Sequence, residues 1–397
     1  MAFLSSTFNS ERRGRRALTA MLIAVGACAA IDMTCRWLLP MSDTVTRNRT
    51  AREYFRAEPV PDIQIFGDSV IDRALVADAL SDGTPLTARN DALASSRPPT
   101  TYYLLREQLA EGKLPKAIVF AHIPRSFDDA FTARLAGSFA EWHELPSVYA
   151  MASRPTEAVY GTLARFSYLL MLRKQFKDLF LNGDHRFFSI PEDRFRYTPD
   201  YAREMVDSYM TDPVAYEASQ ETFDGTLSNR DSTFSVSAEN DEYFRKTLEL
   251  AKSYEVPVFW LTPLAAETTN EVDEENGYYD ELAKYLEPFE QSGDLIVLEL
   301  RPEVYADELF SDYIHPKALA TIQFSCSMRR YASVIAEVLG EQPKSGLSAS
   351  EGRNFAGSPT RLDKEPLPRD WKDRCHDLGS MLPQKAAGSV REIDASP

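Results

Sequence analysis

The segment Asp62-Ile63-Gln64-Ile65-Phe66-Gly67-Asp68-Ser69 decides how this chain is expected to fold. Its two isoleucines alternate with a polar glutamine, which is typical of a β-strand. From Val70 to Leu80 the apolar residues recur at helical spacing, so a helix is expected directly after Ser69. The predicted strand thus passes into the predicted helix through Gly67-Asp68-Ser69.

Short apolar strands continue to alternate with amphipathic helices along the chain. Strands are expected at 62–66, 116–122, 256–261 and 294–300, and helices at 70–80, 101–111, 241–254, 277–289 and 316–339. This order predicts an α/β protein with a mainly parallel sheet and helices on both faces, hence three layers. Ligands of such sheets bind at the edge formed by the carboxyl ends of the strands.

The N-terminus predicts a membrane anchor. Residues 1–16 include four arginines and are expected to stay in the cytoplasm, while residues 17–39 are interpreted as the membrane-spanning segment. Two alternatives stay open: a cleaved signal peptide, for which Ala27-Cys28-Ala29 offers small residues, and a lipoprotein signal, suggested by Val25-Gly26-Ala27-Cys28. Each of the three places the main domain outside the cytoplasm, in the periplasm or outside the cell.

The exported part divides by composition. Residues 40–60 are interpreted as a polar tether, 61–340 as the α/β domain, and 341–397 as a poorly ordered tail rich in Pro, Ser, Gly and charges. Residues 128–240 interrupt the strand–helix alternation and are rich in aromatic side chains. We interpret them as a mostly helical insertion that covers a site, with ordinary core packing as the alternative for any single aromatic residue.

Charge and cysteine usage narrow the function classes. The net charge is −16, and residues 261–312 hold fifteen acidic residues against two basic ones. Such a surface repels phosphate backbones, so no nucleic-acid partner is expected; a solvated acidic face is the simplest interpretation. No CxxC or Cys/His cluster suggests a metal site, and no cofactor is expected. Cys326 and Cys375 are candidates for a disulfide if this end of the chain is exported.

Ser69, His315 and Asp312 carry the chemistry that the sequence predicts. Ser69 lies between a strand and a helix, where helix-start N–H groups can stabilise an oxyanion; a simple helix cap is the alternative role for a serine here. His315 lies in Asp312-Tyr313-Ile314-His315-Pro316, just before the last expected helix. Imidazole suits the base that a serine nucleophile needs, and an acid three residues earlier can orient it.

These two blocks resemble those of the SGNH (GDSL-type) hydrolase superfamily, over roughly residues 60–340. The resemblance implies a flavodoxin-like α/β/α fold, with Ser69 as nucleophile, His315 as general base and Asp312 as its orienting acid. More narrowly, the chain resembles a membrane-tethered branch that includes alginate-type O-acetylation proteins and the D-alanyl transfer protein of teichoic acids. Asn90 and the stretches 102–106 and 116–127 support this narrower resemblance more weakly.

One feature of the superfamily is missing. Its oxyanion hole usually takes a glycine from a second block and an asparagine from a third, but Ala121-His122-Ile123-Pro124 stands where Gly-x-Asn-Asp is expected. Asn90 is the substitute candidate, together with the backbone N–H of Ser69; an ordinary loop asparagine is the alternative. Asp68 and His122 are weaker candidates for substrate binding, with core or surface placement as the alternative for His122.

Three functions follow from these residues. The first is O-acyl transfer, or ester hydrolysis, on a cell-surface polysaccharide or glycolipid through an acyl-Ser69 intermediate, with acetyl as the expected group. A multispanning membrane acyltransferase is a candidate partner for it. The second is a tethered esterase or lipase for small esters. The third is a catalytically inert protein of the same fold that binds or assembles glycans.

Overall fold

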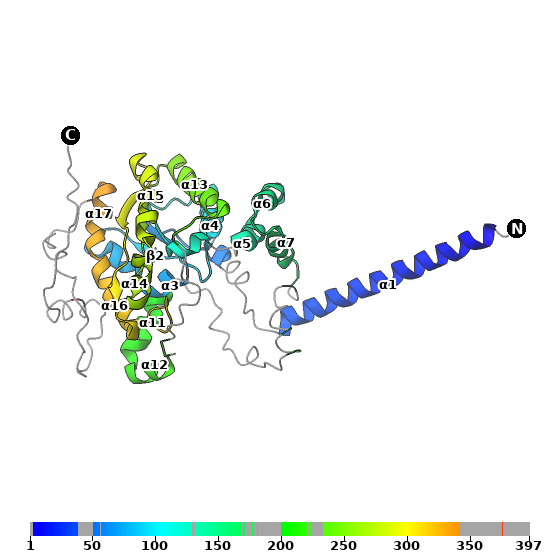
Figure 1. Ribbon diagram of the computed structural model, residues 1–397, viewed down its shortest axis with the longest axis horizontal. Helices are drawn as coiled ribbons and strands as arrows, with labels where there is room; N and C mark the ends of the chain where they lie inside the picture. Colours follow the sequence, from blue (N-terminus) through cyan, green and yellow to red (C-terminus); the bar gives the residue numbers. More distant parts are fainter. Residues whose placement is uncertain are drawn as a thin grey trace.

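The structure is a computed structural model of the 397-residue chain, and it describes residues 3–38, 51–55, 57–128, 132–167, 170, 177, 181, 200–220, 222–223, 233–341 and 375. The long N-terminal helix α1 (Phe3–Leu38) extends away from the body of the protein (Figure 1). Its segment Arg16–Thr34 has a mean hydropathy of 1.8 and is long and apolar enough to cross a membrane. None of that segment is buried inside the protein.

A five-stranded sheet forms the centre of the body. Its strands are β1 (Ile63–Gly67), β2 (Ala88–Asn90), β3 (Ala117–Ala121), β4 (Val258–Leu261) and β6 (Ile296–Glu299). They lie in the order β2-β1-β3-β4-β6, and every neighbouring pair is parallel. The expected parallel α/β architecture is confirmed. A separate parallel pair, β5 (Ala265–Ala266) with β7 (Val304–Tyr305), precedes the loop that carries His315.

Helices cover both faces of this sheet because successive strand residues point to opposite sides. Val119 and Phe259 pack in one core, whereas Phe120 and Trp260 pack in the other. The first core is covered by α3 (Ser69–Ala74), η1 (Ala77–Ser81), α11 (Tyr201–Thr211), α16 (Ala318–Met328) and α17 (Arg330–Val338). The second is covered by α4 (Pro98–Ala110), α13 (Ala238–Ser253) and α15 (Tyr278–Gln291).

Beside the second core lies a group of three short helices, which we call the lobe. It consists of α5 (Thr132–Phe139), α6 (Leu145–Met151) and α7 (Pro155–Ala164). The other elements are η2 (Pro124–Asp128), α12 (Pro213–Ser219), α14 (Glu267–Glu275) and η4 (Asp307–Leu309). Within residues 132–220, the described elements are helices, as expected of the insertion. Most of its aromatic-rich middle, including Phe187 and Phe188, lies outside the described residues.

Part of the segment interpreted as tether packs on the α/β body. Ala51 and Phe55, in the segment interpreted as tether, are buried in the second core, and Arg52 forms an ion pair with Glu107 of α4. The folded body therefore begins ahead of residue 61. Of the expected tail, 341–397, only Glu341 and Cys375 belong to the described residues.

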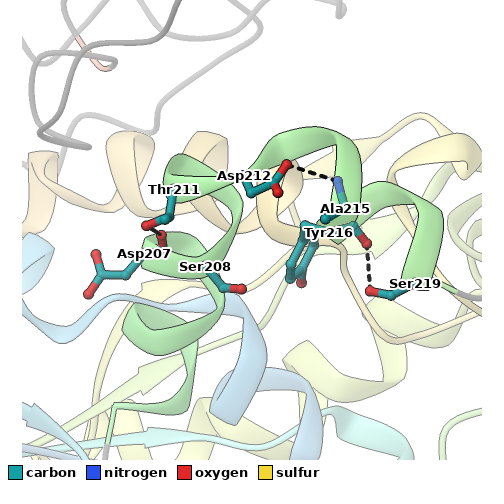
Figure 2. Close-up of a pocket in the computed structure, with 7 residues that line it drawn as sticks. All are labelled: Asp207, Ser208, Thr211, Asp212, Ala215, Tyr216 and Ser219. Atoms are coloured by element: carbon teal, nitrogen blue, oxygen red, sulfur yellow. Dashed lines mark hydrogen bonds between the residues drawn. The ribbon is translucent and has the colours of Figure 1, made fainter.

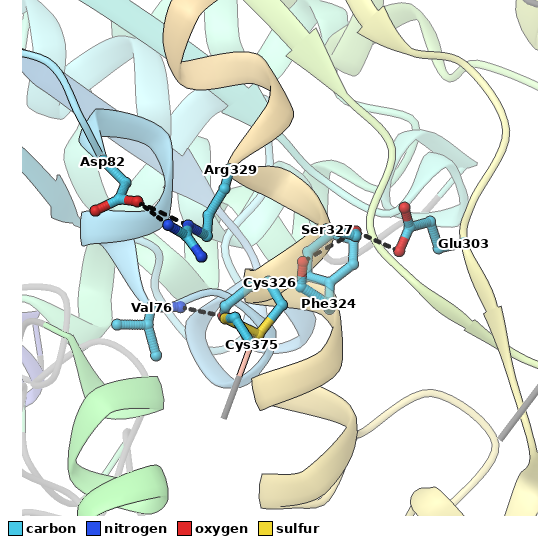
Figure 3. Close-up of a disulfide and its surroundings, with 9 residues drawn as sticks. Val76, Asp82, Glu303, Phe324, Cys326, Ser327, Arg329 and Cys375 are labelled. Carbon is cyan, nitrogen blue, oxygen red and sulfur yellow. Dashed lines mark hydrogen bonds and ion pairs between the residues drawn. A yellow bond between two sulfur atoms is a disulfide. The ribbon is translucent and has the colours of Figure 1, made fainter. Parts of the chain in front are cut away.

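A disulfide joins Cys326 of α16 to Cys375, and both cysteines are buried (Figure 3). The pairing that the sequence left open is thus present. Beside it, Arg329 donates to the carboxylate of Asp82 across 2.7 Å, which ties the junction of α16 and α17 to η1 (Figure 3). The disulfide holds Cys375, in the C-terminal segment, against the α/β body.

Candidate active site

Ser69 is the first residue of α3 and follows β1 after a single intervening residue. Asp68 caps the helix by accepting the N–H of Val70 across 3.0 Å. Gly67 is required by close packing, since a Cβ at this position would overlap Ile71 and the backbone oxygen of Ala121. The serine hydroxyl is thereby held, half-buried, at the carboxyl edge of the sheet, where helix-start N–H groups lack intrahelical partners.

The three residues predicted as a triad lie within hydrogen-bonding distance of one another. Ser69 Oγ is 2.9 Å from His315 Nε2, and His315 Nδ1 is 2.7 Å from Asp312 Oδ2. A carboxylate can only accept, so Nδ1 carries the proton and donates it to Asp312. The other ring nitrogen is then free to accept the hydroxyl proton of Ser69. This is the tautomer that a general base requires.

The loop that carries His315 is closed on itself. Phe310 and Pro316 form an antiparallel bridge, and the N–H of Ser311 donates to the carbonyl of His315 across 2.9 Å. Thr269 of α14 donates its hydroxyl to the carbonyl of Tyr313 across 2.7 Å. Because its backbone is bonded within the loop and to a neighbouring helix, the imidazole is held in place before any ligand arrives.

Asp312 is held in its charged form. Burial alone would raise its pKa, but the hydrogen bond and charge of His315 and the N–H groups of Ile314 and His315 lower that pKa to about 2. Those two N–H groups reach Oδ1 across 2.9 and 2.8 Å, while Oδ2 receives the imidazole. The carboxylate therefore remains available to orient and stabilise an imidazolium near neutral pH.

Asp68 lies under the site and does not face it. It is 1% exposed, and its second oxygen accepts the N–H of Ile123 across 2.9 Å. Burial raises its pKa, against the opposing effect of the Arg97 charge and of the two backbone hydrogen bonds. The side chain predicted to bind substrate instead ties the end of β1 to the segment after β3, which fixes the backbone around Ser69.

His122 is also buried beneath the candidate site. It is fully buried, its ring packs on Phe120, and its Nε2 lies 3.0 Å from Thr101 Oγ1. Burial, reinforced by the nearby charge of Arg97, lowers its pKa to about 3, so the ring is neutral at physiological pH. The expectation that His122 lines the site is replaced by its alternative, core placement. Arg97, which the sequence analysis did not single out, supplies the positive charge next to this buried layer.

Asn90 has a different role from the one expected. Its amide donates to the carbonyls of Ile71 and Leu75, across 2.8 and 2.9 Å, and its Oδ1 accepts the N–H of Ala92. Both amide hydrogens are therefore used in capping the C-terminal end of α3. In this arrangement Asn90 offers no hydrogen to an oxyanion, and it acts on the site only by holding the helix of Ser69.

A tight turn after β2 is a feature that sequence reasoning missed. The N–H of Leu93 donates to the carbonyl of Gly67 across 3.1 Å, and the N–H of Ser96 returns to the carbonyl of Leu93 across 2.9 Å. Ser95, at the third position, has φ of +62°, which resembles a type II turn. Glycine usually marks such turns, and the sequence gives none here. The turn brings backbone amides next to the Gly-Asp-Ser block.

A surface pocket lies elsewhere. It has a volume of about 440 Å³ and is lined by residues of α11 and α12, including Asp207 and Tyr216 (Figure 2). Asp212 accepts the N–H of Ala215 inside it, so its walls belong to one helix pair (Figure 2). The pocket does not include Ser69, Asp312 or His315. Among the described residues no group of three or more His, Cys, Asp or Glu side chains is arranged to hold a metal ion.

No protein-family model matches the chain, and no curated protein is significantly similar to it in sequence. The residues and their geometry therefore carry the functional argument.

Proposed function

We propose that this protein is a membrane-anchored serine O-acyltransferase or acylesterase of the SGNH type, acting on a cell-surface polysaccharide or glycolipid. The observation that carries the proposal is the chain of contacts from Ser69 Oγ to His315 Nε2 and from His315 Nδ1 to Asp312. The parallel strand order β2-β1-β3-β4-β6 supports a flavodoxin-like fold, since it is equivalent to the order 2-1-3-4-5 of that class.

The proposed reaction has two halves. His315 Nε2 takes the proton of Ser69 as Oγ bonds to the acyl carbon, and the tetrahedral intermediate collapses when the leaving oxygen takes that proton from His315. The acyl group is then esterified to Ser69. In the second half a sugar hydroxyl, or water, gives its proton to His315 and attacks the acyl carbon, and Ser69 regains its proton. Asp312 stays charged throughout and stabilises the imidazolium.

Backbone amides are the proposed oxyanion donors. The N–H of Ser69 is one, because it begins α3. An N–H of the turn Leu93–Ser96 is the second, since that turn is bonded to Gly67, two residues before the nucleophile. This assignment replaces Asn90, whose amide hydrogens are bonded to α3. A missing donor typically costs about 3 kcal/mol of barrier, so the turn decides whether the site is efficient.

An exported location is part of the proposal. The apolar segment Arg16–Thr34 supports a single-pass anchor, and the arginines before it favour a cytoplasmic N-terminus. The Cys326–Cys375 disulfide supports an oxidising compartment, periplasmic or extracellular, for the main domain. A tethered domain acts most readily on a substrate at the same surface, which favours a polymer or glycolipid, with a multispanning acyltransferase as proposed acyl source.

Two other functions, an inert glycan-binding protein and an esterase for small esters, each have an observation in their favour. The substitution of Ala121-His122-Ile123-Pro124 for the third block favours a catalytically inert glycan-binding or assembly protein. A tethered esterase for small esters needs only the triad contacts and no polymer. The half-buried Ser69 and His315 lie at the carboxyl edge of the sheet, which we call the rim, and not in the pocket between α11 and α12. This position suits a large acceptor better than a long acyl chain.

Turnover by the full-length protein in detergent tests the proposal. We expect hydrolysis of an activated acetyl ester to fall to background in Ser69→Ala and to be unchanged in Ser138→Ala, a half-buried serine of α5 that serves as the matched control. Intact mass after a brief reaction should show one acetyl group on the wild type and none on Ser69→Ala. Transfer that appears only when an oligosaccharide acceptor is added supports the transferase. Wild-type turnover in Ser69→Ala would remove the triad from the proposal.

A further inference from the structure

Two large aromatic side chains are exposed together on the lobe. Trp142, in the segment between α5 and α6, is 65% exposed, and Phe166, two residues after α7, is 57% exposed. Their rings stack with centroids 5.6 Å apart and planes 16° apart. Stacking holds the pair as one rigid, outward-facing apolar surface.

The same surface continues along α7. Val159 and Leu163 are 41% and 48% exposed, and they lie four residues apart, hence on one side of the helix. The opposite side of α7 packs closely on α5, because a Cβ on Gly161 would overlap the backbone of Arg134. The close packing of the two helices leaves the row Val159, Leu163 and Phe166 facing outward. We call this row, with Trp142, the aromatic surface.

A direct contact places the aromatic surface beside the end of α1. Ser167, the residue after Phe166, donates its hydroxyl to Asp32 across 2.9 Å. Asp32 lies two residues before the end of the apolar segment Arg16–Thr34, about 3 Å along the helix axis. Figure 1 shows the lobe on the side of the body that faces α1. If α1 spans a bilayer, Phe166 is at the level where the helix leaves the hydrocarbon layer.

We propose that the aromatic surface rests in the interfacial layer of the same bilayer that α1 spans. Tryptophan and other amphipathic aromatics favour this layer, where ring and headgroup region meet. Glu141, next to Trp142, is exposed, and Arg165 turns its guanidinium to the backbone carbonyl of Gly137. The carboxylate beside Trp142 and the engaged guanidinium of Arg165 favour binding through buried apolar area over attraction to anionic lipid. The body gains a second membrane contact, which fixes its orientation about α1.

Fluorescence quenching of the full-length protein tests this placement. The chain is reconstituted into phosphatidylcholine nanodiscs with or without lipid brominated high on its acyl chains, and Trp142→Phe isolates the contribution of Trp142 by difference. We expect brominated lipid to remove most of that contribution and aqueous iodide to remove little. Leu163→Asp, an exposed site that leaves the core intact, should weaken the bromolipid effect, whereas Ser138→Ala should not. The effect should be the same with and without phosphatidylglycerol.

Each other outcome overturns the proposal. If iodide and not brominated lipid quenches Trp142, the surface faces water. If neither quencher reaches Trp142, protein covers it, and a second copy or another partner is its occupant. The measurement follows emission and not turnover, so its result does not depend on whether Ser69 is catalytic.

Discussion

Two histidines of this protein lie near an aspartate and a hydroxyl, yet their settings differ. His315, at the rim, has both ring nitrogens within 3 Å of a partner, Ser69 on one side and Asp312 on the other. His122, beneath the rim, is 3.0 Å from the Thr101 hydroxyl, but its Nδ1 is 3.9 Å from Asp68 and makes no hydrogen bond among the described residues. The same three chemical groups thus make a chain of hydrogen bonds in one place and a packed core in the other.

Burial accounts for the difference. Asp312 lies on a half-exposed loop, where hydrogen bonds overcome the effect of burial and its pKa falls to about 2. Asp68 and His122 are buried, so desolvation raises the pKa of the acid and lowers that of the base to about 3. The charged form of Asp312 is therefore favoured at the rim, whereas the charged forms of Asp68 and His122 are disfavoured beneath it.

Removing each imidazole in turn is the strongest test of this comparison. We expect His315→Ala to lower kcat by up to about 10⁶-fold with little change in Tm, because it removes the base from a half-exposed loop. His122→Ala should instead destabilise the fold by about 2–4 kcal/mol, since it opens a cavity against Phe120, and should retain the activity of the folded fraction. Turnover and thermal unfolding of both variants are the measurements. The reverse pattern would show that the buried histidine is the functional one.

Changing the acid at the rim has the next largest effect. Asp312→Asn can keep one oxygen for the N–H groups of Ile314 and His315, but it presents an amide to His315 Nδ1 and so favours the wrong tautomer. A fall of about 10⁴-fold in kcat is expected. The wild-type carboxylate has a lowered pKa, so its contribution to stability is present above pH ~4 and is lost as pH falls towards 2. In Asp312→Asn, the part of the acid-induced loss of stability that comes from this carboxylate should therefore be absent. Full activity of this variant would exclude an orienting acid at position 312.

The sequence predicted four strands of the sheet and the place of the candidate site for one reason. Short apolar strands between helical patterns are visible without any tertiary information, either as a continuous run, as at 117–121, or as alternation, as at 63–65. Ser69 and the His315 loop each follow such a run, and the carboxyl ends of parallel strands share one edge. That the three side chains meet could be predicted from this rule. Whether they catalyse acyl transfer stays a prediction.

The missed features depend on partners that are distant in sequence. Strand β2 has only three residues, with a charged arginine at its centre, so no pattern marks it. Asn90 at its end bonds to the carbonyls of Ile71 and Leu75, where α3 stops and the chain turns extended at Leu75. The expected single helix 70–80 is therefore α3 followed by η1. The same tertiary contact both ends that helix and withdraws Asn90 from the oxyanion role.

Asp200 gives the smallest and most specific test of how burial controls the carboxyl groups. It accepts the N–H of Asn90 across 3.1 Å beside the edge strand β2, and burial raises its pKa to about 6. The backbone hydrogen bond and Arg203 oppose that rise, whereas Asp91 and Asp78 add to it. A raised carboxyl pKa means that the folded state holds the proton longer than the unfolded state, so this contribution to stability is full below pH ~4 and is lost as pH rises through about 6.

Asp200→Asn should remove the loss of stability that the wild type shows as pH rises through about 6. Asparagine keeps the acceptor oxygen and tolerates the left-handed conformation of this residue, whose φ is +60°. The variant is expected to gain on the order of 2 kcal/mol over the wild type at pH 7.5 and almost nothing at pH 4. Urea unfolding at the two pH values measures the difference, with Asp207→Asn on the exposed side of α11 as control. An equal gain at both pH values would mean that folding does not raise the pKa of Asp200, and that burial does not govern this carboxyl as it governs Asp68.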